Sequence, residues 1–198
     1  MKFAWWLSIA LGGLYFVILP LQPYPGSAGV KGLSIATLAV IAWRSSARLL
    51  SLGLAASSAG DVLLDVGPQK LFVPGLLAFL TAHLLYTALF VRQRGRFRWW
   101  AALPFVYAAV FAVWLAPDLG ALRVPVFIYI AVIAAMASTS LCLPATWMVP
   151  SGAVLFLVSD SVLAAGRFKA AVPLGGFLVW GTYYAAQFLI ARGMLKRP

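Results

Sequence analysis

Long apolar runs separated by short polar segments make up almost the whole chain. A membrane-spanning helix needs about 20 predominantly apolar residues. On this basis the pattern predicts eight transmembrane helices, of which the second is the shortest. They are expected at residues 3–20, 30–43, 49–66, 71–91, 99–115, 124–143, 147–165 and 172–191. The alternation that is typical of membrane strands is missing, so the predicted fold class is an all-α polytopic membrane protein.

Composition agrees with this interpretation. The 198 residues are 64% hydrophobic and 10% charged, which leaves too little polar sequence to cover a soluble domain of this size. No linker or soluble domain interrupts the runs, so residues 1–198 are expected to form a single transmembrane domain. The first run has no A-x-A cleavage site before Pro20, and further runs follow it. It therefore reads as the first helix rather than as a signal peptide.

The basic residues are placed as in a membrane protein. The formal net charge is +11, but these residues stand singly or in short clusters between apolar runs, which argues against a nucleic-acid-binding protein. With eight spans, ten of them fall on the side that holds both termini and five on the other. The positive-inside rule therefore predicts cytoplasmic termini, most simply in a bacterial inner membrane. The five on the other side are Lys31, Lys70, Arg123, Arg167 and Lys169.

An internal repeat emerges when the chain is shifted by 99 residues. Seven identities then fall within the 22 positions from 53 to 74, among them Asp61 on Asp160. Average residue usage gives roughly two or three matches in such a window. The repeat predicts two four-helix halves, 1–99 and 100–198, in the same orientation because four is an even number of spans. Both aspartates are then expected at equal depth, five residues from the outer ends of their helices, facing one cavity.

Two carboxylates within apolar runs are the strongest candidates for a functional site. All four acidic residues are aspartates, and Asp61 (in SSAGDVLLD) and Asp160 (in FLVSDSVLAAG) lie inside predicted spans. A charge there costs about 3 kcal/mol on insertion scales, so such residues usually serve a function. The alternative is a buried structural pair. Asp65 is expected to be a solvated helix end, and Asp118 a loop residue.

Several polar side chains are candidates to support the two aspartates. Ser57 precedes Asp61 by one helical turn, and His83 lies near the middle of its span with Tyr86 on the same face. His83 also fits a simple hydrogen-bonded tie between helices. The last span adds Tyr183, Tyr184 and Gln187, of which Gln187 shares a face with one of the tyrosines. With one histidine and one cysteine in the chain, neither a zinc site nor another cofactor is expected.

The segments GDVLLD, FVPGLLAFLTAHLLY, GAVLFLVSDSVLA and TYYAAQFLI resemble the YhhN family of lysoplasmalogenases. The resemblance is clearest at residues 50–95 and 150–192. It implies an eight-helix membrane enzyme that hydrolyses the vinyl ether bond of lysoplasmalogens to a fatty aldehyde and a glycerophospho-alcohol. It also implies that Asp61 and Asp160 correspond to the two essential aspartates of the family. The implied partners are a lysophospholipid substrate and membrane lipids, and no protein partner is evident.

Two other classes of function remain open from the residues. A small-solute or proton-coupled transporter would also place polar groups inside the membrane and repeat its architecture, and a lipid-binding protein without turnover fits as well. Two carboxylates accompanied by histidine and tyrosine favour an enzyme, because they suit acid–base catalysis. The sequence does not decide which aspartate is the acid.

The charge asymmetry generates a prediction about topology. Reporter domains fused after residue 198 and within the basic loop at 92–98 should both report the cytoplasm. A signal from the outer side at either position would contradict the eight-span arrangement.

Overall fold

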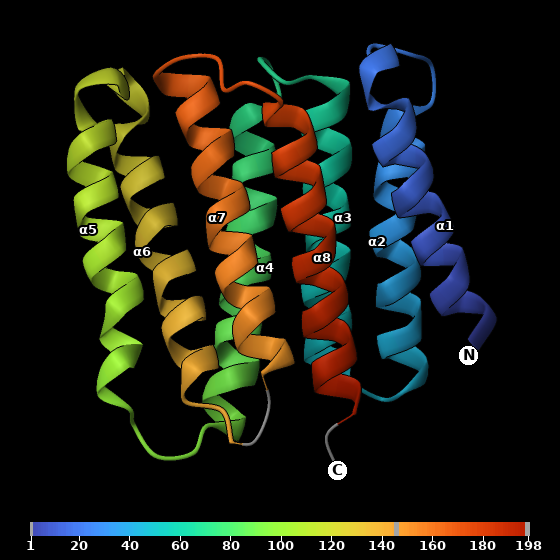
Figure 1. The fold of residues 1–198 in the computed structure, drawn as a ribbon, viewed down its shortest axis with the longest axis vertical. Coiled ribbons are helices and arrows are strands. Elements are labelled where there is room, and N and C mark those ends of the chain that lie inside the picture. Colours follow the sequence, from blue (N-terminus) through green and yellow to red (C-terminus); the bar gives the residue numbers. More distant parts are fainter. Residues whose placement is uncertain (1, 145–146, 197–198) are drawn as a thin grey trace. The chain divides into compact units, whose positions relative to one another are not determined.

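The computed structural model describes residues 2–144 and 147–196, and within these ranges the regular structure is entirely helical (Figure 1). Short 3₁₀ turns at Leu19–Leu21, Trp99–Ala102, Ala116–Asp118 and Gly120–Leu122 join or precede some of the α-helices. The eight α-helices of the described residues are α1 Lys2–Ile18, α2 Ser27–Arg44, α3 Arg48–Val66, α4 Phe72–Gln93, α5 Leu103–Leu115, α6 Arg123–Leu141, α7 Met148–Phe168 and α8 Gly175–Leu195. The all-α prediction is confirmed.

Six segments in the described part of the chain are long and apolar enough to cross a membrane. They correspond to α1, α3, α4, α5 with its flanking turns, α6 with the turn before it, and α7. Helices α2 and α8 fall outside this set, because α2 carries Lys31 and Arg44 and α8 carries several aromatic and polar residues. The chain is thus an integral membrane protein.

Proline marks where several helices begin. It occupies the first turn of α4, α5, α6 and α7, at Pro74, Pro104, Pro125 and Pro150. Backbone N–H groups in the first turn have no acceptor within the helix, so proline, which lacks this group, breaks no helical hydrogen bond there. Helix α3 ends before Gly67-Pro68, because the residue that precedes proline disfavours the helical conformation.

Helix α7 differs from α3 at its end. No proline follows until Pro173, and α7 continues through Gly166 to Phe168. Asp160 therefore lies eight residues from the end of its helix, whereas Asp61 lies five from the end of α3. These offsets correspond to about 12 Å and 8 Å along the helix axes. The expectation of equal distances from the helix ends is wrong.

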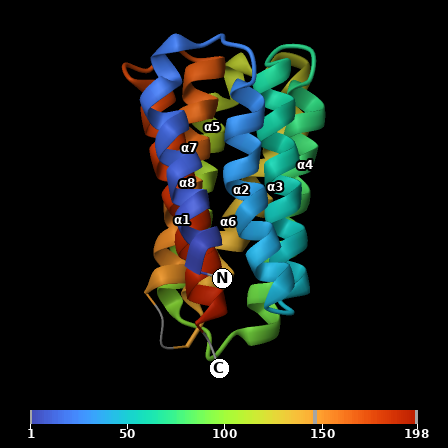
Figure 2. The ribbon, with the colours of Figure 1, turned by 90° about the vertical axis from the view of Figure 1, so that its right-hand side faces the viewer.

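The described residues group into two compact units. The first comprises the described residues of 1–86 and 194–198, and the second comprises residues 87–193. Within the first unit α2 packs against both α1 and α3, and Figure 2 shows α2 and α3 side by side. Glycine permits this close approach, because a Cβ atom at Gly32 would lie 2.6 Å from Cγ2 of Val62.

The second unit contains the end of α4, all of α5, α6 and α7, and most of α8. Helix α6 packs against α5 and α7, and the Ser138 hydroxyl donates to the carbonyl of Ala101 at 2.6 Å. Helices α7 and α8 meet at Gly152, where a Cβ atom would lie 2.8 Å from the backbone oxygen of Ala186. The Ser159 hydroxyl donates to the Val179 carbonyl at 2.9 Å and joins the same two helices nearer to Asp160.

The close contact at Gly152 generates a prediction about stability. Gly152→Ala should lower the free energy of unfolding by about 1–3 kcal/mol, because backbone atoms of α8 must move to admit the methyl group. Gly13→Ala is the matched control, since nothing lies within 4 Å of a Cβ atom there. Apparent melting temperatures in detergent test both variants. Equal melting temperatures would show that α7 and α8 do not pack as described.

Candidate functional site

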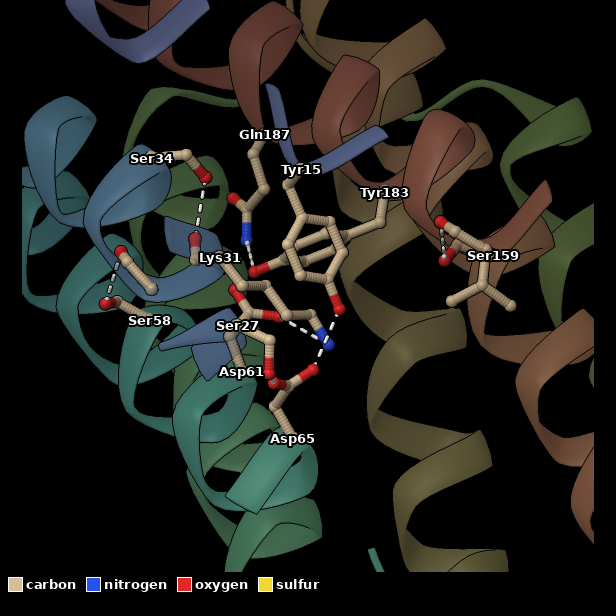
Figure 3. A network of polar contacts seen from close by, with 12 residues as sticks. Tyr15, Ser27, Lys31, Ser34, Ser58, Asp61, Asp65, Ser159, Tyr183 and Gln187 are labelled. Carbon is tan, nitrogen blue, oxygen red and sulfur yellow. Dashed lines mark hydrogen bonds and ion pairs between the residues drawn. The ribbon is translucent and has the colours of Figure 1, made fainter. Parts of the chain in front are cut away.

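Asp61 is buried and paired with a lysine. Its side chain is 2% exposed, and its Oδ1 lies 3.7 Å from Nζ of Lys31, whose side chain is 17% exposed. Lys31 belongs to the second turn of α2, and Figure 3 shows it extending towards Asp61 on α3. A buried carboxylate is costly unless a partner of opposite charge accompanies it. Lys31 therefore accounts for the presence of Asp61 inside an apolar helix.

Hydrogen bonds between helices fix the position of α2 along α3. The Ser58 hydroxyl donates to the Gly32 carbonyl at 2.8 Å, and the Ser51 hydroxyl donates to the Ala39 carbonyl at 2.8 Å. In an apolar environment such bonds stabilise one register, because sliding the helices would leave hydroxyl groups without acceptors. Since Gly32 adjoins Lys31, the Ser58 bond holds the lysine opposite Asp61.

Asp65 is the centre of a second group of contacts in the same unit. Its Oδ1 accepts hydrogen bonds from Oη of Tyr15 at 2.8 Å and from Nε2 of Gln22 at 2.9 Å, and its Oδ2 accepts one from the Ser27 hydroxyl. The donors come from α1, from the following connection and from the first residue of α2. Asp65 is half-buried, so its expected role as a solvated helix end is wrong. It ties three segments to α3.

The two aspartates of α3 are linked through shared neighbours. Lys31, which pairs with Asp61, also lies 5.8 Å from the centre of the Tyr15 ring, and Tyr15 donates to Asp65. Tyr24, in the connection before α2, has a buried hydroxyl without a hydrogen-bond partner. Burial and the Asp65 carboxylate raise the pKa of Tyr24, so it stays neutral. Among the described residues, Lys31 and Tyr15 thus connect the surroundings of Asp61 with those of Asp65.

Asp160 has a different partner in the second unit. Oη of Tyr129 donates a hydrogen bond to its Oδ2 at 2.5 Å. Tyr129 comes from the second turn of α6 and is 8% exposed, and Asp160 is half-buried on α7. A buried phenol requires a partner for its hydroxyl, and a carboxyl oxygen is a strong acceptor.

The remaining candidates of the second unit lie on α8. Nε2 of Gln187 donates to Oη of Tyr183 at 3.3 Å (Figure 3), so Tyr183 is the tyrosine that shares a face with Gln187. Both side chains are buried, and the Tyr183 ring meets Phe156 of α7 edge to face at 5.2 Å. Tyr184 is half-buried and packs against Trp180 and Phe188 instead.

The candidates of the first unit besides Asp61 are completely buried. Ser57, His83 and Tyr86 each have 0% exposure. The Tyr86 ring fills the notch at Gly53, where a Cβ atom would lie 2.5 Å from the ring, so Tyr86 joins α4 to α3 by packing. The Ser57 hydroxyl, one turn before Asp61, is buried and has no hydrogen-bond partner. It is therefore an available donor on the Asp61 side of α3.

Sequence reasoning missed Lys31 and Tyr129 as site residues. Lys31 is the second residue of the expected span 30–43. A cation inside a predicted span indicates a buried partner of opposite charge, and this was the signal that could have identified it. Tyr129 is the only hydrogen-bond donor side chain between Arg123 and Ser138, and a lone phenol inside a span needs an acceptor. Asp61 and Asp160 belong to different units, so their convergence on one cavity stays a prediction.

The fold and these contacts define a polytopic helical membrane protein with two partnered carboxylates within its apolar helices. Comparison with known proteins identifies the family: the YhhN family model matches residues 26–194, and the chain belongs to this family. It is 36% identical over 182 residues to human "Lysoplasmalogenase TMEM86B", covering 87% of this chain and 76% of that protein.

Bacterial and rodent relatives show the same similarity. The chain is 34% identical over 215 residues to "Lysoplasmalogenase" of Mycobacterium tuberculosis (strain CDC 1551 / Oshkosh), covering 96% of this chain and 81% of the relative. It is 33% identical over 207 residues to "Lysoplasmalogenase TMEM86B" of Mus musculus, covering 98% and 88%. No solved structure gave a significant match. The resemblance to the YhhN family is thus confirmed over most of the chain.

The contacts of Asp65 generate a prediction about stability. Asp65→Ala should lower the free energy of unfolding by about 1–3 kcal/mol, because Tyr15 and Ser27 lose their acceptor in a half-buried position. Asp118→Ala is the matched control: it removes a 40% exposed carboxylate that pairs with Lys169, and such surface pairs contribute about 0–1 kcal/mol. Unfolding by titration with sodium dodecyl sulfate measures both. Equal losses would contradict a clamping role for Asp65.

Proposed function

We propose that this protein is a lysoplasmalogenase, a hydrolase that cleaves the vinyl ether bond of a lysoplasmalogen to a fatty aldehyde and a glycerophospho-alcohol. Relatives with that name cover nearly the whole chain. The observation that supports the chemistry best is that each intramembrane aspartate has a dedicated polar partner from the helix before its own. Asp61 and Asp160 are the proposed catalytic residues.

The reaction needs an acid and a base at one bond. Protonation of the β-carbon of the vinyl ether leaves an oxocarbenium ion. Water adds to that ion, and the resulting hemiacetal collapses to the aldehyde and the alcohol. A carboxylic acid supplies the first proton, and a carboxylate stabilises the cation and then takes a proton from the attacking water. In the collapse the two groups exchange roles, which returns each to its starting state.

The supporting residues act around this pair. Ser57 is proposed to donate its unpartnered hydroxyl to the water or to a substrate oxygen near Asp61. Tyr183 and Gln187, joined by a hydrogen bond, are proposed to orient polar atoms of the substrate, as are His83, Tyr86 and Tyr184. The apolar chain of the substrate remains among the helices. No step requires a Lewis acid, so activity is expected without a metal ion or another cofactor.

The proposed topology has all eight helices crossing the membrane. Helix α2 has 18 residues and α8 has 21, or about 27 and 31 Å, which matches a hydrocarbon core of about 30 Å. Both termini then lie on one side, and the basic residues place that side in the cytoplasm. We propose the bacterial inner membrane as the location.

The proposed repeat of two four-helix halves has structural support. The repeat aligns Gly53 with Gly152. At each of these glycines a residue of the following helix packs in the space that a Cβ atom would fill. Lys31 stands 30 residues before Asp61 and Tyr129 stands 31 residues before Asp160. The partner of each aspartate therefore comes from nearly the same place in each half.

The proposed chemistry predicts the effect of removing either carboxyl group. Asp61→Asn and Asp160→Asn should each lower kcat by about 10²–10⁴-fold, because acid–base catalysis supplies gains of this size, while the folded protein is retained. Asp118→Asn should keep full activity. Release of aldehyde from a lysoplasmalogen, followed with a coupled dehydrogenase, measures the rates, and EDTA should not change them. Full activity in either of the two catalytic variants would exclude the pair mechanism.

A further inference from the structure

The partners of the two aspartates differ in charge although their positions correspond. Asp61 meets the ammonium group of Lys31, and Asp160 meets the hydroxyl group of Tyr129. Asp61 is thus compensated by a cation 3.7 Å away, whereas Asp160 is held by a neutral hydrogen-bond donor.

The hydrogen bond from Tyr129 holds the carboxyl group of Asp160 in one orientation, because the hydroxyl engages Oδ2. After the proton has moved to carbon, the same hydroxyl donates to the carboxylate that remains. Its bond is stronger to the charged group, so it stabilises the charge that develops during proton transfer.

We infer that Tyr129 is a positioning residue for Asp160, the proton donor: its hydroxyl orients the carboxyl group and stabilises the charge that remains after proton transfer. This inference rests on the proposed function and assigns one role within it. Tyr129 is suited to this task because it is 8% exposed and lies in an apolar helix, where its hydroxyl is the only polar group of the side chain.

Tyr129→Phe tests the inference, with Tyr107→Phe as the matched control. Tyr107 lies on α5, is 42% exposed and stacks on Phe111, so its hydroxyl has no part in the proposed site. Tyr129→Phe should lower kcat on a lysoplasmalogen by about 10–100-fold, the value of a hydrogen bond to a charged group. KM should change by less than about threefold, because Tyr129 acts through Asp160 and not on the bound substrate. Tyr107→Phe should leave both constants unchanged.

A second measurement separates positioning from a structural role. Protonation of carbon becomes more fully rate-limiting in Tyr129→Phe, so the ratio of kcat in H₂O to kcat in D₂O should rise above that of the parent protein. A variant that merely reduces the folded fraction keeps the parent ratio. If Tyr129→Phe fails to fold, Tyr129→Leu takes its place, since it also lacks a hydrogen-bond donor and suits an apolar helix. It should show the same reduced kcat and raised isotope ratio.

The outcomes distinguish the inference from the proposed function. If Asp160→Asn is inactive but Tyr129→Phe has the parent kcat, the assignment to Tyr129 is wrong and the function stands. An unchanged isotope ratio with a lowered kcat would also overturn the assignment. If the parent protein releases no aldehyde from a lysoplasmalogen, the proposed function itself fails.

Discussion

The cost of placing a carboxylate in an apolar helix governs much of this structure. Asp61 is buried on α3, and a charge in that position requires compensation. Lys31 supplies it from α2, and hydrogen bonds from Ser58 and Ser51 to carbonyls of α2 fix the register that brings the two charges together. Glycine at position 32 lets the two helices approach closely enough for these bonds. The packing of α2 on α3 therefore also holds Lys31 beside Asp61.

The second unit meets the same demand with neutral chemistry. Tyr129 donates to Asp160 from α6, the helix that precedes α7. The difference in charge between the two partners agrees with the unlike tasks proposed for the two carboxyl groups, because acid–base catalysis needs a proton donor and a proton acceptor. Asp65 completes the first unit by tying α1 and the start of α2 to α3, and so supports the segment that carries Lys31.

Hydropathy alone was enough to predict the helices. The expected spans agree with the observed helices to within four residues at each end; the largest differences are at the start of α5, where a 3₁₀ turn occupies Trp99–Ala102, and at the end of α8. The side chains that pair with the aspartates were harder to predict. Lys31 was counted only as a basic residue on the outer side, because its charge is compensated by a residue 30 positions away. Tyr129 was overlooked because a phenol in an apolar run resembles core packing until its acceptor is known. Asp65 shows the same limit, since its three donors come from segments far away in the sequence.

The central proposal is that the vinyl ether is cleaved by protonation of its β-carbon, followed by addition of water to the other carbon of the double bond, the one that carries the ether oxygen. Hydrolysis of a lysoplasmalogen by the purified protein in D₂O tests this most directly, with mass spectrometry of both products. The account predicts one deuterium on the aldehyde carbon next to the carbonyl group. In a parallel reaction in ¹⁸O-labelled water, the glycerophospho-alcohol should remain unlabelled, because its own C–O bond is not broken. An aldehyde without deuterium at that carbon, or ¹⁸O in the alcohol, would contradict the account.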